Sequence, residues 1–222
     1  MSNILRHTST TNFPSHPPGE ATVFVTESLR DDLFRISERC QREGIEFAGH
    51  VQWNGFDFSI PTCYTDNRRG DVVVPPECLH DRHVVYHTHP SPASGLFSLP
   101  SARDFQVFVD AYPHIQTHFI LERHGFIRVT FDWTPYDKPD PNEMFTRLTQ
   151  FLSDHGVNER IVDIDGFAFY KSSVDEWRYV INDHVSSFTH HCFGLRLCFI
   201  SWDEPLEASP FYLKSTSNMM IP

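Results

Sequence analysis

At 222 residues and with a formal net charge of −11, the chain can form one substantial core, and its acidity disfavours a general nucleic-acid or anionic-membrane surface. Five cysteines without regular spacing, and no signal-peptide pattern, favour a reducing, cytoplasmic compartment over a secreted disulfide scaffold. No apolar run approaches the roughly 18 residues of a membrane span, so we expect no membrane or nucleic-acid partner.

The first predicted elements are an arm, a strand and a helix. Residues 1–20 are rich in Ser, Thr, Asn and Pro, which predicts a flexible N-terminal arm. Residues 21–25 predict a short strand. Thr26 is then a suitable N-cap for an amphipathic helix over residues 27–42, and Gly44 is a suitable residue to end it.

A β-hairpin is predicted next. Residues 45–53 alternate between apolar and polar side chains, which places Glu46 on the polar face of a strand. Asn54-Gly55 is a strong signal for a tight turn into a returning strand. Residues 61–82 are polar and interrupted by prolines, so they predict an insertion in the sheet.

Two histidines lie at the end of the following strand. Residues 83–89 have the β-branched and aromatic character of a strand, and Pro90 cannot continue its hydrogen-bond ladder. Because side chains alternate faces along a strand, His87 and His89 point to the same side. Two neighbouring imidazoles at this place can both bind one divalent ion.

A third ligand is available at the start of the next helix. Ser101 and Asp104 have the spacing of an N-cap and a carboxylate three residues on, and an apolar helical pattern follows them. If the intervening loop folds back, the Asp104 carboxylate lies beside the two histidines. Three such ligands leave a fourth tetrahedral position for water, which is typical of a catalytic zinc site.

The second half of the chain has weaker patterns. A hairpin is predicted around Arg123-His124-Gly125, with strands over residues 117–122 and 126–132. Residues 133–222 predict an extension that packs on the same domain or completes it. Its expected elements are a loop over 132–141, helices over 142–155 and 172–187, and strands over 161–170 and 192–202.

Three motifs together carry a family resemblance. Glu46-Phe47-Ala48-Gly49, His87-Thr88-His89-Pro90 and Ser101-Ala102-Arg103-Asp104 resemble the signature of the JAMM metalloproteases of the MPN (JAB1/MPN/Mov34) family. The resemblance covers residues 21–132. It implies an α/β catalytic domain with the MPN/JAMM (cytidine-deaminase-like) fold, a curved mixed sheet flanked by helices.

The resemblance also implies an activity and a role for each residue. His87, His89 and Asp104 would bind one Zn²⁺, Glu46 would be the general base, and Ser101 would donate to the developing oxyanion. The implied reaction is hydrolysis of the peptide or isopeptide bond that follows ubiquitin or a ubiquitin-like protein. The implied partner is therefore that modifier, and a regulatory protein partner is compatible with this role.

One feature departs from the family pattern. The segment between the second histidine and the serine, residues 90–100, is longer than usual, which we interpret as a four-residue loop extension. The extension makes the placement of Asp104 less secure than that of the histidines. Its apolar residues Leu96, Phe97 and Leu99 suggest a contact to substrate.

Each motif also has a simpler interpretation. A His-x-His pair more often binds no metal, Ser-x-x-Asp is more often a capping box alone, and a strand glutamate is usually solvated. The joint occurrence of all three in this order favours a zinc hydrolase. Two alternatives stay open: a peptidase that trims a small sulfur carrier or another peptide, and a metal-free MPN-type scaffold that binds a protein.

Overall fold

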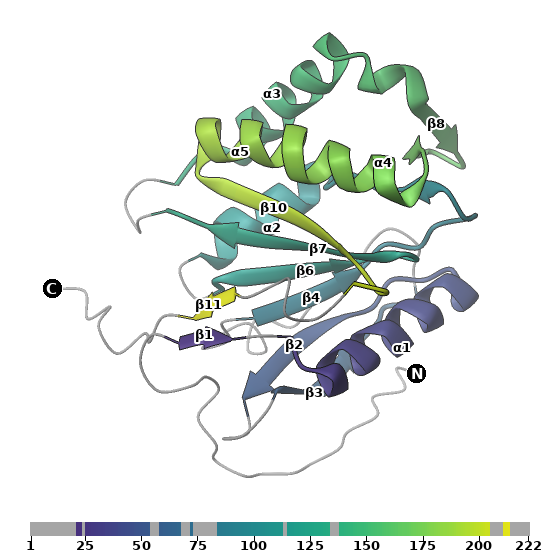
Figure 1. Ribbon diagram of the computed structural model, residues 1–222, viewed down its shortest axis with the longest axis vertical. Helices are drawn as coiled ribbons and strands as arrows, with labels where there is room; N and C mark the ends of the chain where they lie inside the picture. Colours follow the sequence, from purple (N-terminus) through teal and green to yellow (C-terminus); the bar gives the residue numbers. More distant parts are fainter. Residues whose placement is uncertain are drawn as a thin grey trace, which may run out of the picture.

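The structure is a computed structural model, which describes residues 21–23, 25–53, 58–67, 72, 84–112, 115–133, 138–204 and 211–213. The predicted arm over residues 1–20, the Asn54-Gly55 turn and most of the predicted insertion lie outside the described residues. The described part is mixed α/β, with helices flanking a mixed sheet (Figure 1). This class is the one predicted from the sequence.

The central sheet has six strands in the order β10-β7-β6-β4-β2-β3. Their bounds are β2 (Ala48–Trp53), β3 (Phe58–Tyr64), β4 (Val84–Thr88), β6 (Thr117–Leu121), β7 (Gly125–Phe131) and β10 (Leu195–Ser201). β4 and β6 are parallel, and all other neighbours are antiparallel. The histidine strand is thus an inner strand, with the predicted β6–β7 hairpin next to it.

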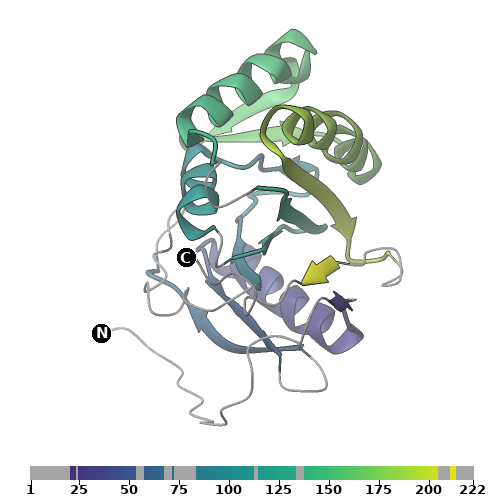
Figure 2. The same ribbon diagram turned by 90° about the vertical axis from the view of Figure 1, so that its left-hand side faces the viewer.

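Helices cover both faces of this sheet (Figures 1 and 2). Helix α1 (Glu27–Glu43) packs on one face, and α2 (Ala102–Ala111) and α3 (Pro141–Asp154) lie on the other side. Along β4, Val84 and Tyr86 join the core beneath α1, so His87 faces the opposite layer. No helix in the described ranges is long and apolar enough to cross a membrane.

Helix α1 has the predicted ends. The Thr26 hydroxyl accepts a hydrogen bond from the Leu29 amide at 3.2 Å. Gly44 adopts a φ of 66°, and its amide donates to the Cys40 carbonyl at 2.8 Å, which closes the last turn. Leu29 and Leu33 are fully buried against the sheet, and each contributes about 1.5–3 kcal/mol by burial.

The β2–β3 pair differs from its prediction in three ways. β2 begins at Ala48 and not at residue 45, and a bulge shifts the pairing between His50 and Gln52. β3 runs through Pro61 to Tyr64, so these residues are not part of an insertion. A proline is tolerated here because β3 is an edge strand and needs no amide for an outer neighbour.

A second, three-stranded sheet has the order β5-β9-β8, in which β5 is the short strand Leu96–Phe97. The single strand predicted over 161–170 is in fact a hairpin of β8 (Ile161–Ile164) and β9 (Phe167–Lys171). Asp165 and Gly166 form its turn with φ values of 56° and 81°, the conformation that Asp-Gly favours. This dipeptide is a sequence signal that the prediction overlooked.

The residues after 171 return to the central sheet. A continuous helical segment comprises α4 (Val174–Tyr179), the π-helical η3 (Val180–Val185) and α5 (Ser186–Phe193). The strand predicted from residue 192 begins at Leu195, because Gly194 ends the helix first. β10 then pairs along all of β7. A further small pair joins β1 (Ala21–Val23) to β11 (Phe211–Leu213).

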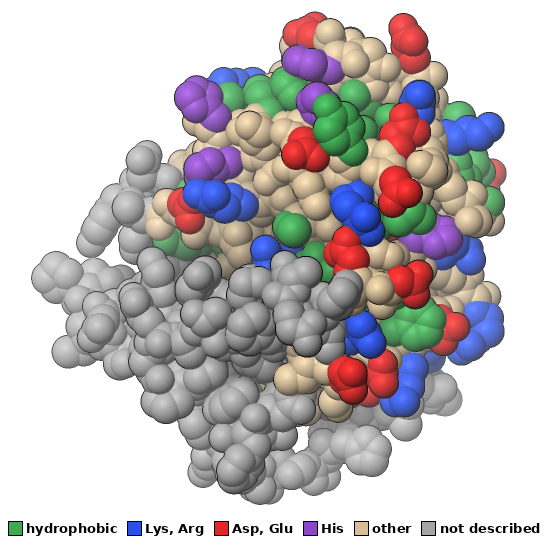
Figure 3. All heavy atoms as spheres, in the orientation of Figure 1, with side chains coloured by type: hydrophobic (Ala, Val, Ile, Leu, Met, Phe, Trp, Pro, Cys, Tyr) green, Lys and Arg blue, Asp and Glu red, His purple; other side chains and the backbone are tan. Residues whose placement is uncertain are grey.

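Charged side chains of both signs lie on the described surface. Figure 3 shows Lys and Arg interspersed with Asp and Glu over the face that it presents. Several form exposed pairs, such as Arg39 with Glu43 at 2.9 Å and Arg147 with Glu143 at 3.3 Å. Ion pairs of this kind contribute about 0–1 kcal/mol each to the free energy of unfolding. The stability of the fold therefore depends mainly on the two apolar cores on either face of the central sheet.

Candidate metal centre

The end of β4 lies beside the start of β2, because these strands are antiparallel. His87 is opposite Ala48 on one side and Ile120 of β6 on the other. One residue further along, the Thr88 amide donates to the Phe47 carbonyl at 2.9 Å, and the Thr88 hydroxyl accepts from the Phe47 amide at 2.9 Å. The sheet therefore brings the segment that begins with Glu46 to the two histidines.

His89 is fixed through its backbone just after β4 ends. Its amide donates to the Leu121 carbonyl at 2.9 Å, and its carbonyl accepts from Gln41 Nε2 at 3.0 Å. These bonds keep the chain extended for two residues beyond His87. The two imidazoles then lie on the same side, with ring centroids 4.7 Å apart.

Asp104 is fixed by the predicted capping box at the start of α2. The Ser101 amide and hydroxyl donate to Asp104 Oδ2 at 2.6 and 2.8 Å, and the Asp104 amide donates back to the Ser101 hydroxyl at 3.2 Å. Ser101 thus holds one carboxylate oxygen, while Oδ1 faces His87. The loop extension does not prevent Asp104 from reaching the histidines.

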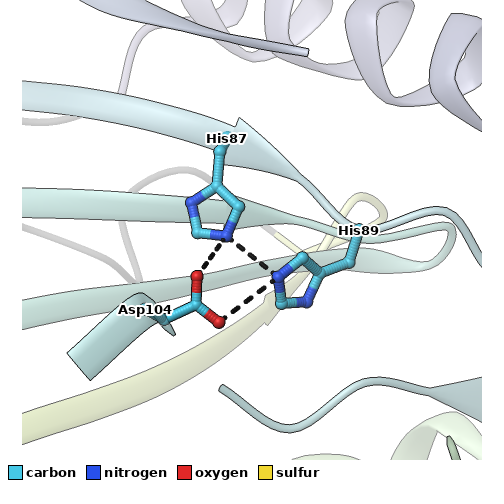
Figure 4. Close-up of side chains that lie close together, drawn as sticks. All are labelled: His87, His89 and Asp104. Atoms are coloured by element: carbon cyan, nitrogen blue, oxygen red, sulfur yellow. Dashed lines mark hydrogen bonds and ion pairs between the residues drawn. The ribbon is translucent and has the colours of Figure 1, made fainter. Parts of the chain in front are cut away.

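The three side chains form a buried cluster (Figure 4). His87 Nε2 lies 2.9 Å from His89 Nε2 and 2.9 Å from Asp104 Oδ1, and His89 Nε2 lies 3.6 Å from Asp104 Oδ2. Ligands of a tetrahedral zinc ion stand about 3.3 Å apart. The donor set and its spacing fit such an ion. In the described part of the chain, this is the one group of three or more side chains that could hold a metal ion.

The electrostatics of the cluster favour a cation. Burial would raise the pKa of Asp104, but the two imidazoles hold it well below its usual value. Burial acts to lower the pKa of His89, yet Asp104, together with Glu46 and Glu122, raises it to about 9. In the metal-free protein a proton on His89 balances the Asp104 charge, and a metal ion can replace that proton.

His118 is a third histidine in this cluster, and sequence reasoning missed it. It is 4% exposed, and its Nε2 lies 2.6 Å from His87 Nδ1. Burial, and then the neighbouring His87, hold the pKa of His118 well below its usual value, which keeps the ring neutral. A neutral His118 can accept the His87 Nδ1 proton and leave His87 Nε2 free for a metal. Only the parallel register of β4 and β6 places it there.

The loop extension is held by a buried carboxylate. Glu122 accepts from the Ser98 amide at 3.1 Å and from Trp177 Nε1 at 2.9 Å, and burial raises its pKa to about 7. Phe97 is 2% exposed and stacks on Trp177 at 5.0 Å. The expected substrate contact by Phe97 is therefore wrong, because its ring is in the core.

Glu46 and Ser101 lie at the same site as the histidines. Together with His89 they line one cavity of about 390 Å³. Glu46 is only 9% exposed, although the alternation placed it on a polar strand face, and it shares the cavity with residues of α3 and of the β8–β9 hairpin. All five residues that the sequence singled out therefore come together, three as possible ligands and two on the cavity wall.

The arrangement has the parts that an open metal site needs: three possible protein ligands, a nearby carboxylate outside that set, and a cavity beside them. No family model, no curated protein and no solved structure matched the chain.

Proposed function

We propose that the chain is a zinc-dependent peptidase or isopeptidase with a JAMM-like site on an MPN-like fold. Its proposed substrate is a peptide or isopeptide bond that follows ubiquitin or a ubiquitin-like protein. The observation that carries the proposal is the cluster of His87, His89 and Asp104, buried and correctly spaced for one ion, with Glu46 on the wall of the adjoining cavity.

Each of the chain's residues has a task in this reaction. Zinc, when bound, lowers the pKa of a coordinated water to about 7 and polarises the carbonyl group. Glu46 takes the proton of the attacking water and delivers it to the departing amine. Ser101 donates a hydrogen bond to the carbonyl oxygen as it gains charge, and Asp104 Oδ2 competes for the same hydroxyl proton.

The ligand set also bears on the scaffold alternative. A scaffold that only binds protein has no use for two imidazoles and a carboxylate buried at these distances, since burying such groups is costly. The enzyme is therefore the better account. The choice between a ubiquitin-like modifier and a smaller peptide as substrate depends on which substrate side chains the cavity beside the metal site accepts.

The first test measures zinc content by elemental analysis in the wild type, His87→Ala and Glu46→Gln proteins. We expect about one zinc per chain in the wild type and in Glu46→Gln, and almost none in His87→Ala. Turnover of a ubiquitin-like isopeptide substrate should be lost in both variants. In Glu46→Gln the loss comes from the missing base, because its ligands are intact.

Two results would contradict the proposal. Folded wild-type protein without zinc, even after dialysis against zinc, would favour the metal-free scaffold. An active Glu46→Gln protein would remove the assigned base and leave the metal site in place.

A further inference from the structure

The cavity beside the metal centre has two unlike ends. One end is lined by Glu46, His89 and Ser101, the residues of the proposed reaction. The other end is lined by side chains of α3 and of the β8–β9 hairpin, among them Phe145 and Phe167. The space of about 390 Å³ has the size of a site for one large side chain or a small ligand.

The far end is mostly apolar, with Thr149 and Asn158 as its polar side chains, and it carries no charge. Leu148, Leu152 and Phe169 form its floor and are at most 4% exposed, while Phe145 and Phe167 are partly exposed at its rim. Among the described residues that line the cavity, Glu46 is the one acid, and there is no lysine or arginine. Such a wall offers nothing to a charged side chain and stabilises an apolar one.

The elements that form this wall have no part in holding the metal. The ligands come from β4, the residue after it and α2, whereas α3 and the β8–β9 hairpin lie more than 35 residues further along the chain. The hairpin is nevertheless joined to the site, because β9 pairs with β5 in the loop between His89 and Ser101. The apolar wall is therefore fixed relative to the ligands.

We propose that this cavity is the specificity pocket of the enzyme, and that it binds a large apolar side chain, phenylalanine or leucine, on the substrate segment that flanks the cut bond. This inference rests on the proposed function and adds the class of substrate. A bound substrate segment that consists only of glycine and other small residues would leave the apolar wall of the cavity in contact with water. The enzyme therefore selects sequences that carry a bulky apolar residue close to the bond.

The probe is a series of acetylated and amidated peptides with a central Gly–Lys bond and alanine elsewhere. Phenylalanine replaces one alanine at a time on either side of this bond. Each peptide is made in two versions, in which the glycine carbonyl is joined either to the main-chain nitrogen or to the side-chain nitrogen of the lysine. Binding is measured by calorimetry to zinc-loaded Glu46→Gln protein, which retains the cavity. At one position, phenylalanine should lower Kd at least about tenfold, as expected for burial of an aromatic ring.

Three variants in the same background locate the effect. Phe145→Ser and Phe167→Ser should each remove most of the gain. Phe34→Ser is the matched control, because Phe34 and Phe145 are both 37% exposed and each contacts one other aromatic ring, Trp202 or Phe105. Phe34 lies on α1 across the central sheet, so its replacement should leave the gain unchanged.

The outcomes separate this inference from the proposed function. No gain at any position, or an undiminished gain in both Phe145→Ser and Phe167→Ser, would overturn the pocket. Cleavage by the wild type without preference for phenylalanine would overturn the pocket and leave the peptidase standing. Phenylalanine-dependent binding that Phe145→Ser abolishes, with no peptide cut by the wild type, would support the pocket and contradict the peptidase.

Discussion

Each possible ligand is held by a different partner. His118 faces Nδ1 of His87, Ser101 holds one oxygen of Asp104, and a backbone hydrogen bond to Leu121 fixes His89. A ligand oriented in this way loses little freedom when the ion binds, so the affinity of the site depends on these partners as well as on the ligands.

The contribution of His118 can be measured with two substitutions. His118→Leu removes the acceptor for the His87 Nδ1 proton, whereas His118→Gln keeps an acceptor of similar size. We expect zinc affinity to fall about 10–100-fold in the leucine variant and to be largely retained in the glutamine variant. Competition with a fluorescent chelator measures both. Equal affinities in the two variants would show that His118 only fills space.

The charge pair of His89 and Asp104 makes metal-free stability depend on pH. The folded pKa of His89, about 9, exceeds its ordinary value of 6.5, so its stabilising contribution is complete below pH 6.5 and is lost as pH rises through 9. The folded pKa of Asp104 is depressed, so its contribution is present above about pH 4 and is lost in stronger acid.

Urea unfolding of chelator-treated protein tests this dependence. Between pH 6.5 and pH 9, the free energy of unfolding should fall by up to about 3 kcal/mol through His89. The His89→Asn variant should show a smaller fall. The pKa of Glu122 is raised to about 7, so the part of the pH dependence of stability that Glu122 causes falls mainly below pH 7. The comparison with His89→Asn separates it from the part that His89 causes. A stability that rises with pH in this range would contradict the pairing.

At the scale of elements, the loop extension acts as a strand. Leu96 and Phe97 form β5, which pairs with Lys171 and Tyr170 of β9. The Ser98 amide then donates to the buried Glu122 carboxylate. The added residues thus connect the ligand-bearing loop to the small sheet, and through Trp177 to α4. This connection positions the apolar wall of the cavity.

Adjacent substitutions distinguish this structural role from contact with substrate. Phe97→Ala removes a ring that is 2% exposed, and we expect the free energy of unfolding to fall by about 3–5 kcal/mol. Leu96→Ala, at a half-buried position, should cost much less, about 1 kcal/mol. Denaturant unfolding measures both. If the Phe97→Ala protein kept its stability and bound substrate more weakly, the result would contradict the structural role and support a direct contact between Phe97 and substrate.

At the scale of the whole molecule, the candidate metal centre joins elements that the chain separates. His87 lies on β4 in the middle of the central sheet, and Asp104 lies on α2 in the layer that covers it. An ion held by both therefore binds the folded state and not the unfolded chain. Metal binding and global stability are then linked.

Thermal unfolding with and without zinc measures this linkage. At a free zinc concentration 100 times Kd, the stabilisation is about 2.7 kcal/mol, which corresponds to a rise in Tm of about 5–10 °C for a protein of this size. The Asp104→Asn variant, which loses one charged ligand, should show little or no rise at the same zinc concentration. An equal rise in that variant would place zinc at another site.

Part of the fold could be predicted because its signals are local. The ends of α1, the capping box of α2 and the β6–β7 hairpin each depend on residues within a few positions, and all three are confirmed. The β8–β9 turn carried an equally local signal, Asp165-Gly166, that the prediction passed over. The extent of β3 could not be predicted, because it depends on β3 being an edge strand.

By itself, the sequence determined which residues could form the metal centre. Strand alternation puts His87 and His89 on one side, and the capping pattern puts Asp104 in a first helical turn. Only the tertiary structure decided that His118 lies against His87, that Glu46 is covered, and that the cavity has an apolar wall. These facts depend on strand register and on the packing of distant segments, which local patterns of side chains do not specify.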